Sequence, residues 1–503
     1  MAKVYDTATD LITFARSSSG TALRRVGYGN ELVTNGDFAT GDLTGWTVIG
    51  SDATHSVTYS SGGARYQSDT TSPVLNFQQG GILEIGKMYQ ITVETTAYTS
   101  GSLKTDSFSG TKILSEGLGT ITINAVASST GLAIVRNSTN VDITIDNISV
   151  KEVIFDRATD PLVLFNHPDD IPRIEYGSDG SLKGLLIEEQ RTNLVTYSED
   201  FENSAWVKSG TVAIDSTLVT GPDGTLSGRR VLNFDDAAGD RLRNPTTIAN
   251  ATLTGSIWVK GEGSNIGKDV RLTLRRIGGA SAISNVTHTL TADWHRLDAT
   301  ITQQPDNTGA NLLLANPANG NEASEVLIYG AQLEEGSFPT SYIPTSGSTA
   351  TRSADVASIP VSAFGYNQTA GTVVVEVEPY VVGDGEYYLS LNDGTTDERA
   401  EIIYSTSVFA TMVSNGVLTS SINLGDTTGV IKVASALKEN DAAACLNGGP
   451  IGTDTSTLMP VGVTTLTIGD RAVSANNKLN GHIKSIQYYP RRLTNAQLQE
   501  LTS

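Results

Sequence analysis

The sequence predicts an all-β protein built from tandem β-sandwiches. Fifty of its 503 residues are glycine, and serine and threonine are frequent, which favours many short strands joined by tight turns. Hydrophobic residues make up 38% of the chain, enough for packed cores, and the length corresponds to about three domains. Runs of alternating apolar and polar residues recur along the whole chain, as half-buried strands require.

The acidic composition limits the partners. The net charge is -20, the isoelectric point is about 4.6, and no block of lysine or arginine offsets this charge. Such a surface is repelled by a phosphate backbone, so nucleic acid is not expected as a partner. The same field disfavours strongly anionic capsules and leaves neutral or amino sugars open.

Cys445 is the only cysteine, so an intrachain disulfide is excluded, and a small buried residue at the end of a strand is expected there.

The opening MAKVYDTATDL lacks the basic and apolar regions of a secretory signal. No run approaches the ~20 apolar residues that a membrane span needs. We therefore expect a protein made in a cytoplasm, with no membrane insertion.

Residues 1–30 form a polar opening segment, and residues 31–153 form the first predicted module. This module opens with NGDFATGDLTGW, which contains turn signals and two candidate core aromatics, Phe38 and Trp46. In KMYQITVETTAY, apolar residues alternate with polar ones as in a half-buried strand. VDITIDNISVKEV closes the module with the same alternation.

Residues 154–194 are expected to form a linker that acts as a clasp. Three prolines early in this segment interrupt any regular element. The string IEYGSDGSLKGLLIEE then predicts a hairpin, with Ile174 and Tyr176 on one strand, a turn at 178–180, and Leu185 to Ile187 on the returning strand.

Residues 195–345 form the second predicted module, which repeats the aromatic opening of the first with Phe201 and Trp206. Residues 346–364 form a linker, and residues 365–503 form a third sandwich with a short helix at its end. Thr494 and Gln497 have the spacing of a capping box, and Leu493 with Leu498 has that of a hydrophobic staple.

Several strings resemble those of tailed-phage virion proteins, such as tail fibres, spikes and head fibres. The matching residues are Pro172 to Tyr176, Leu185 to Glu189, Arg191 to Leu194 and Tyr197 to Trp206, together with the ending GAQLEEGSFPTSYIPT. The opening LITFARSS resembles a segment that in this family continues directly into the clasp, which implies that residues 31–153 are an inserted module. The first module resembles carbohydrate-binding modules of the jelly-roll, galactose-binding-like type, and the third resembles concanavalin A-like or laminin-G-like sandwiches. The resemblance thus implies two jelly-roll modules and one concanavalin A-like sandwich.

Sugar rings stack on exposed aromatic side chains, so the tryptophans are the candidate carbohydrate-binding residues. All four lie in the first two modules: Trp46, Trp206, Trp258 and Trp294. Their positions near strand starts also suit packing in the cores, and no cluster in the sequence singles out a binding face.

The resemblance to jelly-roll modules also implies a structural calcium ion, held between the opening loop and the last strand. Asp37 and Asp146 match those positions, and carboxylates suit a hard cation. The alternative is that both are ordinary acids of a turn and a strand edge. No other cofactor is expected.

Glu376 and Glu378 are the strongest catalytic candidates, because they lie about 7 Å apart on one face of a predicted strand. Concanavalin-like hydrolases carry three alternating acids, whereas Pro379 and Tyr380 follow here. The third sandwich also has no tryptophan to form a sugar subsite. A solvated strand face is the better interpretation, so no catalytic residue is expected.

Together these observations predict a non-enzymatic phage fibre or spike protein, located in the virion, that recognises glycans on the host surface. Its partners would be other virion proteins and host glycans. One alternative is a purely structural decoration or adaptor protein, and another is a polysaccharide depolymerase. The resemblance implies a homo-oligomer, with a trimer as the expected state because such fibres are usually trimeric; no heptad repeats support this.

Overall fold

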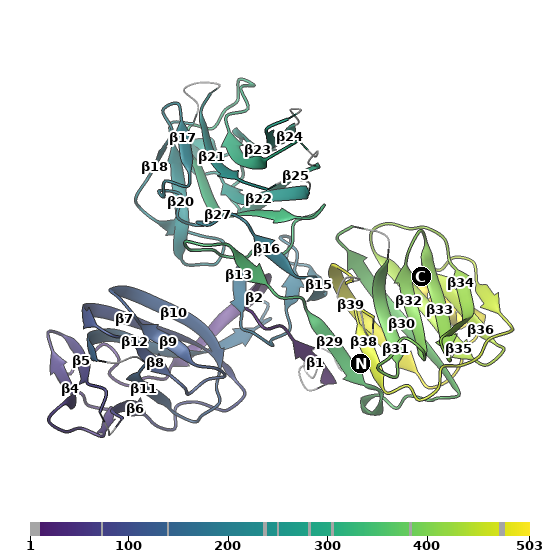
Figure 1. Cartoon of the computed structure of the whole chain (residues 1–503), viewed down its shortest axis with the longest axis horizontal. Helices are drawn as coiled ribbons and strands as arrows, with labels where there is room; N and C mark the ends of the chain where they lie inside the picture. The colour runs from purple at the N-terminus through teal and green to yellow at the C-terminus, as the bar shows by residue number, and fades with distance from the viewer. Residues whose placement is uncertain are drawn as a thin grey trace. The chain divides into compact units, whose positions relative to one another are not determined.

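The computed structural model describes residues 11–71, 74–137, 140–234, 239–248, 251–279, 283–302, 306–381, 385–471 and 478–503. They form antiparallel β-sheets arranged as sandwiches, which confirms the predicted fold class (Figure 1). The chain divides into two compact units, Arg24–Leu162 and the combination of Met1–Leu23 with Val163–Ser503. In the part of the chain that the structure describes, no helix has the length and hydrophobicity to cross a membrane.

The unit Arg24–Leu162 is one β-sandwich. Its larger sheet has the order β10-β7-β12-β2-β13, with β5 paired to β12 and β4 to β5. The strands of this sheet are β10 (Gly119–Val126), β7 (Met88–Ser100), β12 (Val141–Phe155), β2 (Gly20–Glu31), β13 (Leu162–His167), β5 (Gly63–Ser68) and β4 (His55–Ser60). The opposite sheet has the order β3 (Thr47–Ile49), β6 (Asn76–Gln79), β11 (Leu132–Arg136), β8 (Leu103–Thr105) and β9 (Lys112–Ser115).

The alternation predicted for residues 87–98 is confirmed in β7. Tyr89, Ile91 and Val93 are buried, and they belong to one core cluster with Phe77 of the opposite sheet. The intervening polar residues of β7 point away from this core, because successive side chains of a strand alternate between its faces. Local pattern alone therefore fixes which face of this strand is covered.

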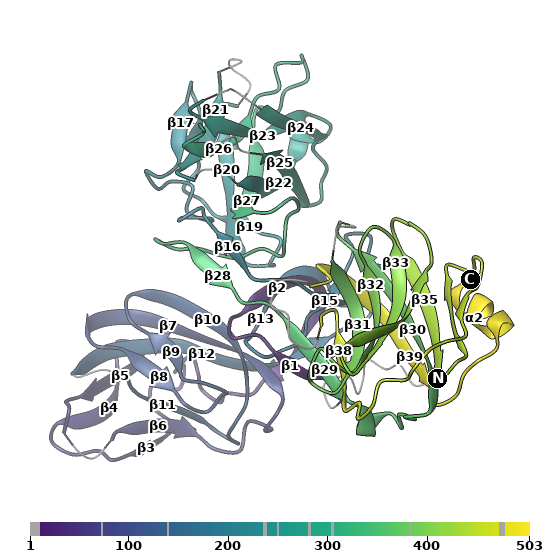
Figure 2. The same ribbon diagram turned by 45° about the vertical axis from the view of Figure 1, so that its right-hand side comes forward.

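A second sandwich occupies most of residues 195–345. Its first sheet has the order β17 (Val207–Ser209), β21 (Arg241–Thr246), β26 (Gly309–Ala315), β23 (Asp269–Ile277) and β24 (Ile283–Thr289). Its second sheet has the order β18 (Ala213–Ile214), β20 (Leu226–Leu232), β27 (Val326–Glu335), β22 (Thr252–Lys260) and β25 (His295–Thr302), with β19 (Val219–Thr220) paired to β20. Figure 2 shows the strands of both sheets. Leu242, Leu272 and Leu312 from the first sheet and Ile257 and Val259 from the second belong to one core.

The C-terminal sandwich includes strands from earlier parts of the chain as well as from residues 365–503. One sheet has the order β1 (Thr13–Ala15), β29 (Val356–Pro360), β38 (Thr465–Ile468), β31 (Glu386–Asn392), β32 (Arg399–Tyr404), β33 (Val408–Ser414) and β34 (Val417–Asn423). The other has the order β14 (Ile174–Tyr176), β15 (Leu182–Ile187), β39 (Gly481–Tyr489), β30 (Ala370–Pro379), β35 (Ile431–Lys438), β36 (Ala442–Leu446) and β37 (Gly452–Asp454). A separate two-stranded ribbon pairs β16 (Arg191–Asn193) with β28 (Ala350–Arg352).

The predicted hairpin of the clasp is confirmed, since Ile174 pairs with Leu185. Leu185 also pairs with Ile483 of β39, so the hairpin forms the edge of a sheet in the C-terminal sandwich. Our sequence interpretation placed this hairpin in a linker. Strand pairing over some 300 residues has no local signal, which is why the sequence did not reveal it.

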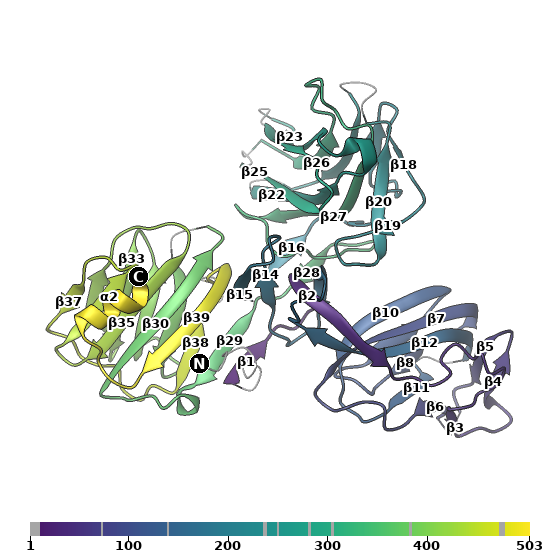
Figure 3. The same ribbon diagram turned by 180° about the vertical axis from the view of Figure 1, so that it is seen from behind.

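The predicted capping box at the end of the chain is also confirmed. The hydroxyl of Thr494 accepts a hydrogen bond from the backbone N–H of Gln497, and the backbone N–H of Thr494 donates to the side-chain oxygen of Gln497. The helix that follows, α2 (Asn495–Thr502), lies beside β35 and β36 (Figure 3). Leu498 packs there against Cys445, which is fully buried as expected.

Five fully buried charged side chains form an ion network where the clasp hairpin, the opening segment and the 346–364 segment meet. Its members, which we call the buried ion network, are Arg16, Arg173, Glu188, Arg352 and Asp355. Arg173 is bound to both acids: its Nη1 lies 2.8 Å from Glu188, and its Nη2 contacts Asp355. Asp355 also accepts a hydrogen bond from the backbone N–H of Glu188 at 2.9 Å.

The buried ion network holds three cations against two anions, and the surrounding polar groups complete its hydrogen bonding. Ser341 donates its N–H and its hydroxyl to Glu188, both at 2.7 Å. Arg16 donates to the carbonyl of Pro168 at 2.7 Å as well as to Asp355 at 3.3 Å. Burial, together with the neighbouring charge of Arg173, lowers the pKa of Arg16 to about 10. The network therefore stabilises the junction only while each buried charge keeps its partners.

Candidate functional site

The structure separates the four candidate tryptophans into two pairs. Trp46 and Trp206 are buried, with 8% and 2% of their surface exposed. Trp46 stacks on Phe77 with ring centroids 4.2 Å apart, and Trp206 contacts Phe201 at 4.9 Å. Both indole N–H groups donate to backbone carbonyls of their own opening loops. For these two residues packing in the core is the correct interpretation, and neither ring is free to stack on a sugar.

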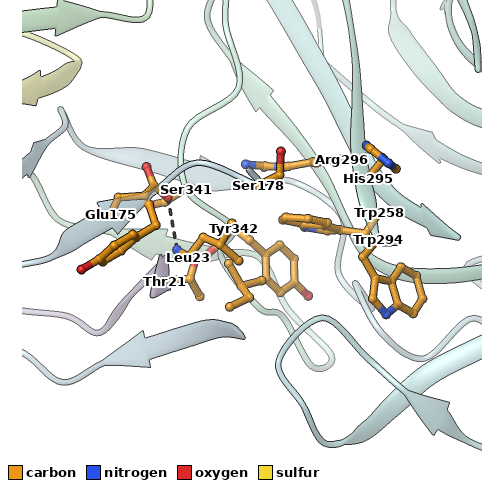
Figure 4. A pocket seen from close by; sticks show the side chains of 12 residues that line it. Thr21, Leu23, Glu175, Ser178, Trp258, Trp294, His295, Arg296, Ser341 and Tyr342 are labelled. Atoms are coloured by element: carbon orange, nitrogen blue, oxygen red, sulfur yellow. Dashed lines mark hydrogen bonds between the residues drawn. The ribbon is translucent and has the colours of Figure 1, made fainter. Parts of the chain in front are cut away.

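Trp258 and Trp294 are half-buried and line the same pocket, which has a volume of about 270 Å³ (Figure 4). The lining comes from four parts of the chain: β2 and β13, the clasp hairpin, the second sheet of the second sandwich, and the segment after β27. The lining residues are Thr21, Leu23, Leu164, Glu175, Tyr176, Ser178, Trp258, Trp294, His295, Arg296, Ser341 and Tyr342. All of them belong to the larger compact unit.

The aromatic side of the pocket is built on the outer face of the second sheet. Because Ile257 and Val259 point into the core, Trp258 between them points outward. Trp294 immediately precedes β25, and both indoles pack against the buried rings of Tyr329 and Tyr342. In Figure 4 the rings of Trp258, Trp294 and Tyr342 gather on one side, whereas Glu175 lies on the other.

The indole N–H of Trp258 is a buried donor with no hydrogen-bond acceptor among the described residues. An indole N–H can only donate, and leaving such a group unpaired costs about 1–3 kcal/mol. The Trp294 N–H differs, because it donates to the carbonyl of Thr220 at 3.3 Å. Trp258 therefore contributes its ring to the aromatic wall, while its N–H stays buried.

Arg296 provides the cationic part of the pocket. It lies opposite Trp258 in the register of β22 and β25. Its guanidinium donates to the carbonyl of Thr340 at 2.6 Å and to the hydroxyl of Ser256 at 2.9 Å, both neutral acceptors. These two bonds hold the side chain against the pocket wall and leave it able to polarise a bound hydroxyl or carbonyl.

Glu175 provides the acceptor side and connects three elements. Its carboxylate accepts the backbone N–H of Leu23 at 3.3 Å and lies 2.7 Å from Nε2 of His482. The hydroxyl of Tyr380 lies 3.5 Å from the same carboxylate. A carboxylate held this way has lone pairs left for sugar hydroxyls.

Behind the aromatic wall, Tyr342 donates its hydroxyl to Glu199 at 2.9 Å. Burial raises the pKa of the Glu199 carboxyl, and hydrogen bonds from Tyr342 and Tyr329 only partly oppose this effect. Glu199 does not line the pocket. Its role is to fix the orientation of the two tyrosines on which the tryptophans pack.

The candidate calcium residues lie in the smaller unit. The pKa of Asp146 is raised, mainly by burial and to a lesser degree by the nearby negative charges of Glu94 and Asp37. Among the described residues no group of three or more acids, histidines or cysteines is arranged to hold a metal ion. Asn147 donates to Glu94 at 2.7 Å, so part of that charge is already satisfied within the protein. Calcium binding by Asp37 and Asp146 stays a prediction.

Glu376 and Glu378 lie on one face of β30, as their spacing predicts, but each faces a lysine. Glu376 lies 3.4 Å from Lys484, and Glu378 lies 3.0 Å from Lys183. Neither residue lines the pocket. Both glutamates therefore form ion pairs on a half-exposed face of the sheet.

Sequence reasoning did not bring the partners of the tryptophans together in one pocket. Glu175 and Tyr342 lie in two of the strings that resemble phage virion proteins, and Arg296 lies in neither, but the three residues are separated by tens to more than a hundred residues in the chain. The only local signal was the outward position of Trp258 between two apolar residues. That pattern indicates an exposed face but not what covers it.

No protein-family model matches the chain, and no curated protein matches it. Among solved structures it is similar to the CBM22-1–CBM22-2 tandem domain of Paenibacillus barcinonensis Xyn10C, at 10% identity and a TM-score of 0.24, over 61% of this chain and 98% of that chain. It is also similar to domains LG4-5 of the mouse laminin alpha1 chain, at 8% identity and a TM-score of 0.19, over 56% of this chain and 96% of that chain. TM-scores this low support no conclusion about the fold, which is therefore described from its own sheets.

Proposed function

We propose that this protein is a non-catalytic, glycan-binding component of a phage virion and that the pocket at Trp258 and Trp294 holds a sugar ring. The observation that carries the proposal is the pairing of two half-buried indoles with polar groups on the opposite wall. Apolar C–H faces of a sugar stack on indole rings, while its hydroxyls need donors and acceptors at the edges. Arg296 supplies a donor and Glu175 an acceptor.

The size of the pocket favours one ring over a long chain. Its volume of about 270 Å³ lies just below the ~300–1,000 Å³ typical of small-molecule sites. A single weak site gains strength when many copies face the same surface, as in a multi-copy particle. A terminal sugar on the host surface is therefore the ligand that fits best.

The virion setting is supported by the sequence resemblance. The strings that resemble phage virion proteins contribute Arg16, Arg173 and Glu188 to the buried ion network, and also Ser341, which donates a hydrogen bond to Glu188. They thus supply parts of one structural junction next to the pocket, and Ser341 lines the pocket itself. A fibre or spike would need such a rigid junction to present the pocket to the host.

The test is binding of labelled protein to intact bacterial cells, with and without periodate oxidation of the surface glycans. We expect binding that periodate abolishes. The variant Trp294→Ala removes one aromatic wall and is expected to weaken binding at least about tenfold. Tyr98→Ala, which removes an aromatic ring that is 40% exposed in the smaller unit, is the matched control and should bind normally.

Equal binding by the Trp294→Ala and wild-type proteins, with both folded, would rule out the pocket as the glycan site. An absence of binding to every strain tested would favour the alternative of a purely structural virion protein. Binding that survives periodate would point to a protein receptor instead. Trp258→Ala removes the second aromatic side chain that lines the pocket and should also lose affinity.

A further inference from the structure

Four arginines lie on the outer face of the first sheet of the second sandwich, the sheet on the opposite side of its core from Trp258. In β21, Leu242 points into the core, which turns Arg241 and Arg243 outward. In β23, Val270, Leu272 and Leu274 are all buried, which turns the alternate residues outward. These include Arg271 and Arg275. We call Arg241, Arg243, Arg271 and Arg275 the arginine face.

The strand register groups these side chains closely. Arg241 and Arg271 both pair with Ala315 of the strand between them, so they form one row across the sheet. Neighbouring strands are about 4.8 Å apart, which places these two residues roughly 10 Å from one another. Arg275 lies four residues along β23 from Arg271, about 14 Å away. The arginine face is therefore a strip that spans the neighbouring strands β21, β26 and β23.

None of the four arginines forms an ion pair with any residue that the structure describes. Arg243 donates to the side-chain oxygen of Asn311 and Arg271 to the carbonyl of Pro317, both at 3.4 Å and both neutral. The Nε atoms of Arg241, Arg243 and Arg271 are buried without a described acceptor. Unpaired, closely spaced like charges repel one another and cost stability, so their presence calls for an anionic partner.

The local charge is the reverse of that of the whole chain, which has 54 acidic and 34 basic residues. Among the described residues of the five strands of this sheet, Asp269 is the one acidic residue, and it lies at the start of β23. Its oxygens already accept hydrogen bonds from Thr289 and Asn319, at 2.7 and 2.8 Å. It therefore does not neutralise the arginine face.

We propose that the arginine face is a second binding site and that its ligand is an acidic polysaccharide with carboxylates at regular intervals. A guanidinium forms paired hydrogen bonds with a carboxylate, and a strip of this kind suits an extended chain. Two exposed polar residues of β24 share this outer face: Asn285, whose side-chain oxygen accepts the hydroxyl of the buried Thr273 at 2.7 Å, and Thr287, which pairs with Arg271 in the strand register. The amide group of Asn285 and the hydroxyl of Thr287 are placed to bind the hydroxyl groups of such a chain.

A polysaccharide fits better than a nucleic acid. Duplex DNA carries one charge per about 1.7 Å, and a protein with a net charge of -20 repels so dense a polyanion strongly. A polysaccharide with one carboxylate per sugar has a lower charge density than DNA, so it is repelled less. Its carboxylates can still bind the arginines. For this face, the local positive charge thus opposes the net-charge expectation that strongly anionic capsules are disfavoured.

The experiment measures binding of the full-length protein to polygalacturonate, with the same polymer after reduction of its carboxyl groups as the neutral control. We expect binding to the acidic polymer alone, weakening steadily as salt rises from ~0.05 to ~0.5 M. The double variant Arg241→Gln/Arg243→Gln should bind at least about tenfold more weakly. Arg65→Gln makes the same type of change in the smaller unit, at an arginine paired with Asp142, and should bind normally.

Three outcomes would overturn the proposal: no binding to polygalacturonate, an equal loss in Arg65→Gln and in the double variant, or tighter binding to single-stranded DNA of equal charge. Melting temperatures show whether the variants fold, and relief of repulsion predicts that the double variant melts no lower than the wild type. Trp294→Ala should bind polygalacturonate normally. This separates failure of the arginine face from failure of the pocket.

Discussion

The buried ion network makes a sharp prediction for Glu188→Gln, which keeps the shape of the side chain and removes its charge. Burial alone would raise the pKa of Glu188, but the charges of Arg352 and Arg173 outweigh it and lower the pKa to about 2, against an ordinary 4.5. The difference of about 2.5 pH units, at about 1.4 kcal/mol each, corresponds to roughly 3 kcal/mol of folding free energy. Removing one partner of a buried pair costs about 3–5 kcal/mol in general, which agrees.

The assay is urea unfolding followed by tryptophan fluorescence, since three of the four tryptophans lie in the same compact unit as the network. The pKa is depressed in the folded state, so the contribution of Glu188 is complete above about pH 4.5 and is lost as the pH falls through about 2. The deficit of Glu188→Gln relative to wild type should therefore shrink between pH 5 and pH 2.

The neighbouring Glu189 is the matched control. It pairs with Arg191 at 2.5 Å at a site where its side chain is 26% exposed, so Glu189→Gln should cost at most about 1 kcal/mol. Equal losses in the two variants, or a deficit for Glu188→Gln that does not change between pH 5 and pH 2, would refute the reasoning. Either result would mean that packing, and not charge, holds the junction together.

Three further predictions concern single acids. The folded-state pKa of Glu199 is raised, so its contribution to stability is present below its ordinary pKa and lost as the pH rises; Glu199→Gln should be more stable than wild type at pH 8 and similar at pH 4, by thermal melting. If Asp37 and Asp146 hold calcium, then millimolar Ca²⁺ should raise the melting temperature relative to EDTA, and Asp146→Asn should abolish the rise; identical melting curves would remove the calcium site. Because Glu376 faces Lys484, we expect no release of reducing sugar from host polysaccharide, and release that is lost in Glu376→Gln would establish a depolymerase instead.

The sequence by itself determined the features that depend on neighbouring residues. The alternation around Ile91 predicted a strand and its buried face, the spacing of Thr494 and Gln497 predicted a helix cap, and the turn between Tyr176 and Leu185 predicted a hairpin. Each of these is a local property, because a strand repeats every two residues and a cap spans one helical turn. The alternating arginines of β21 and β23 belong to the same class, although their meaning required the strand register.

Only the tertiary structure decided which segments these elements pack against. Trp46 and Trp258 both closely follow a Thr-Gly pair, yet one lies in a core and the other lines a pocket, because different segments cover them. Arg16 and Asp355 are 339 residues apart in the chain and touch in the buried ion network. Contacts of this kind follow from which sheet edges and faces close on one another, and the two-residue period of a strand carries no information about its partner.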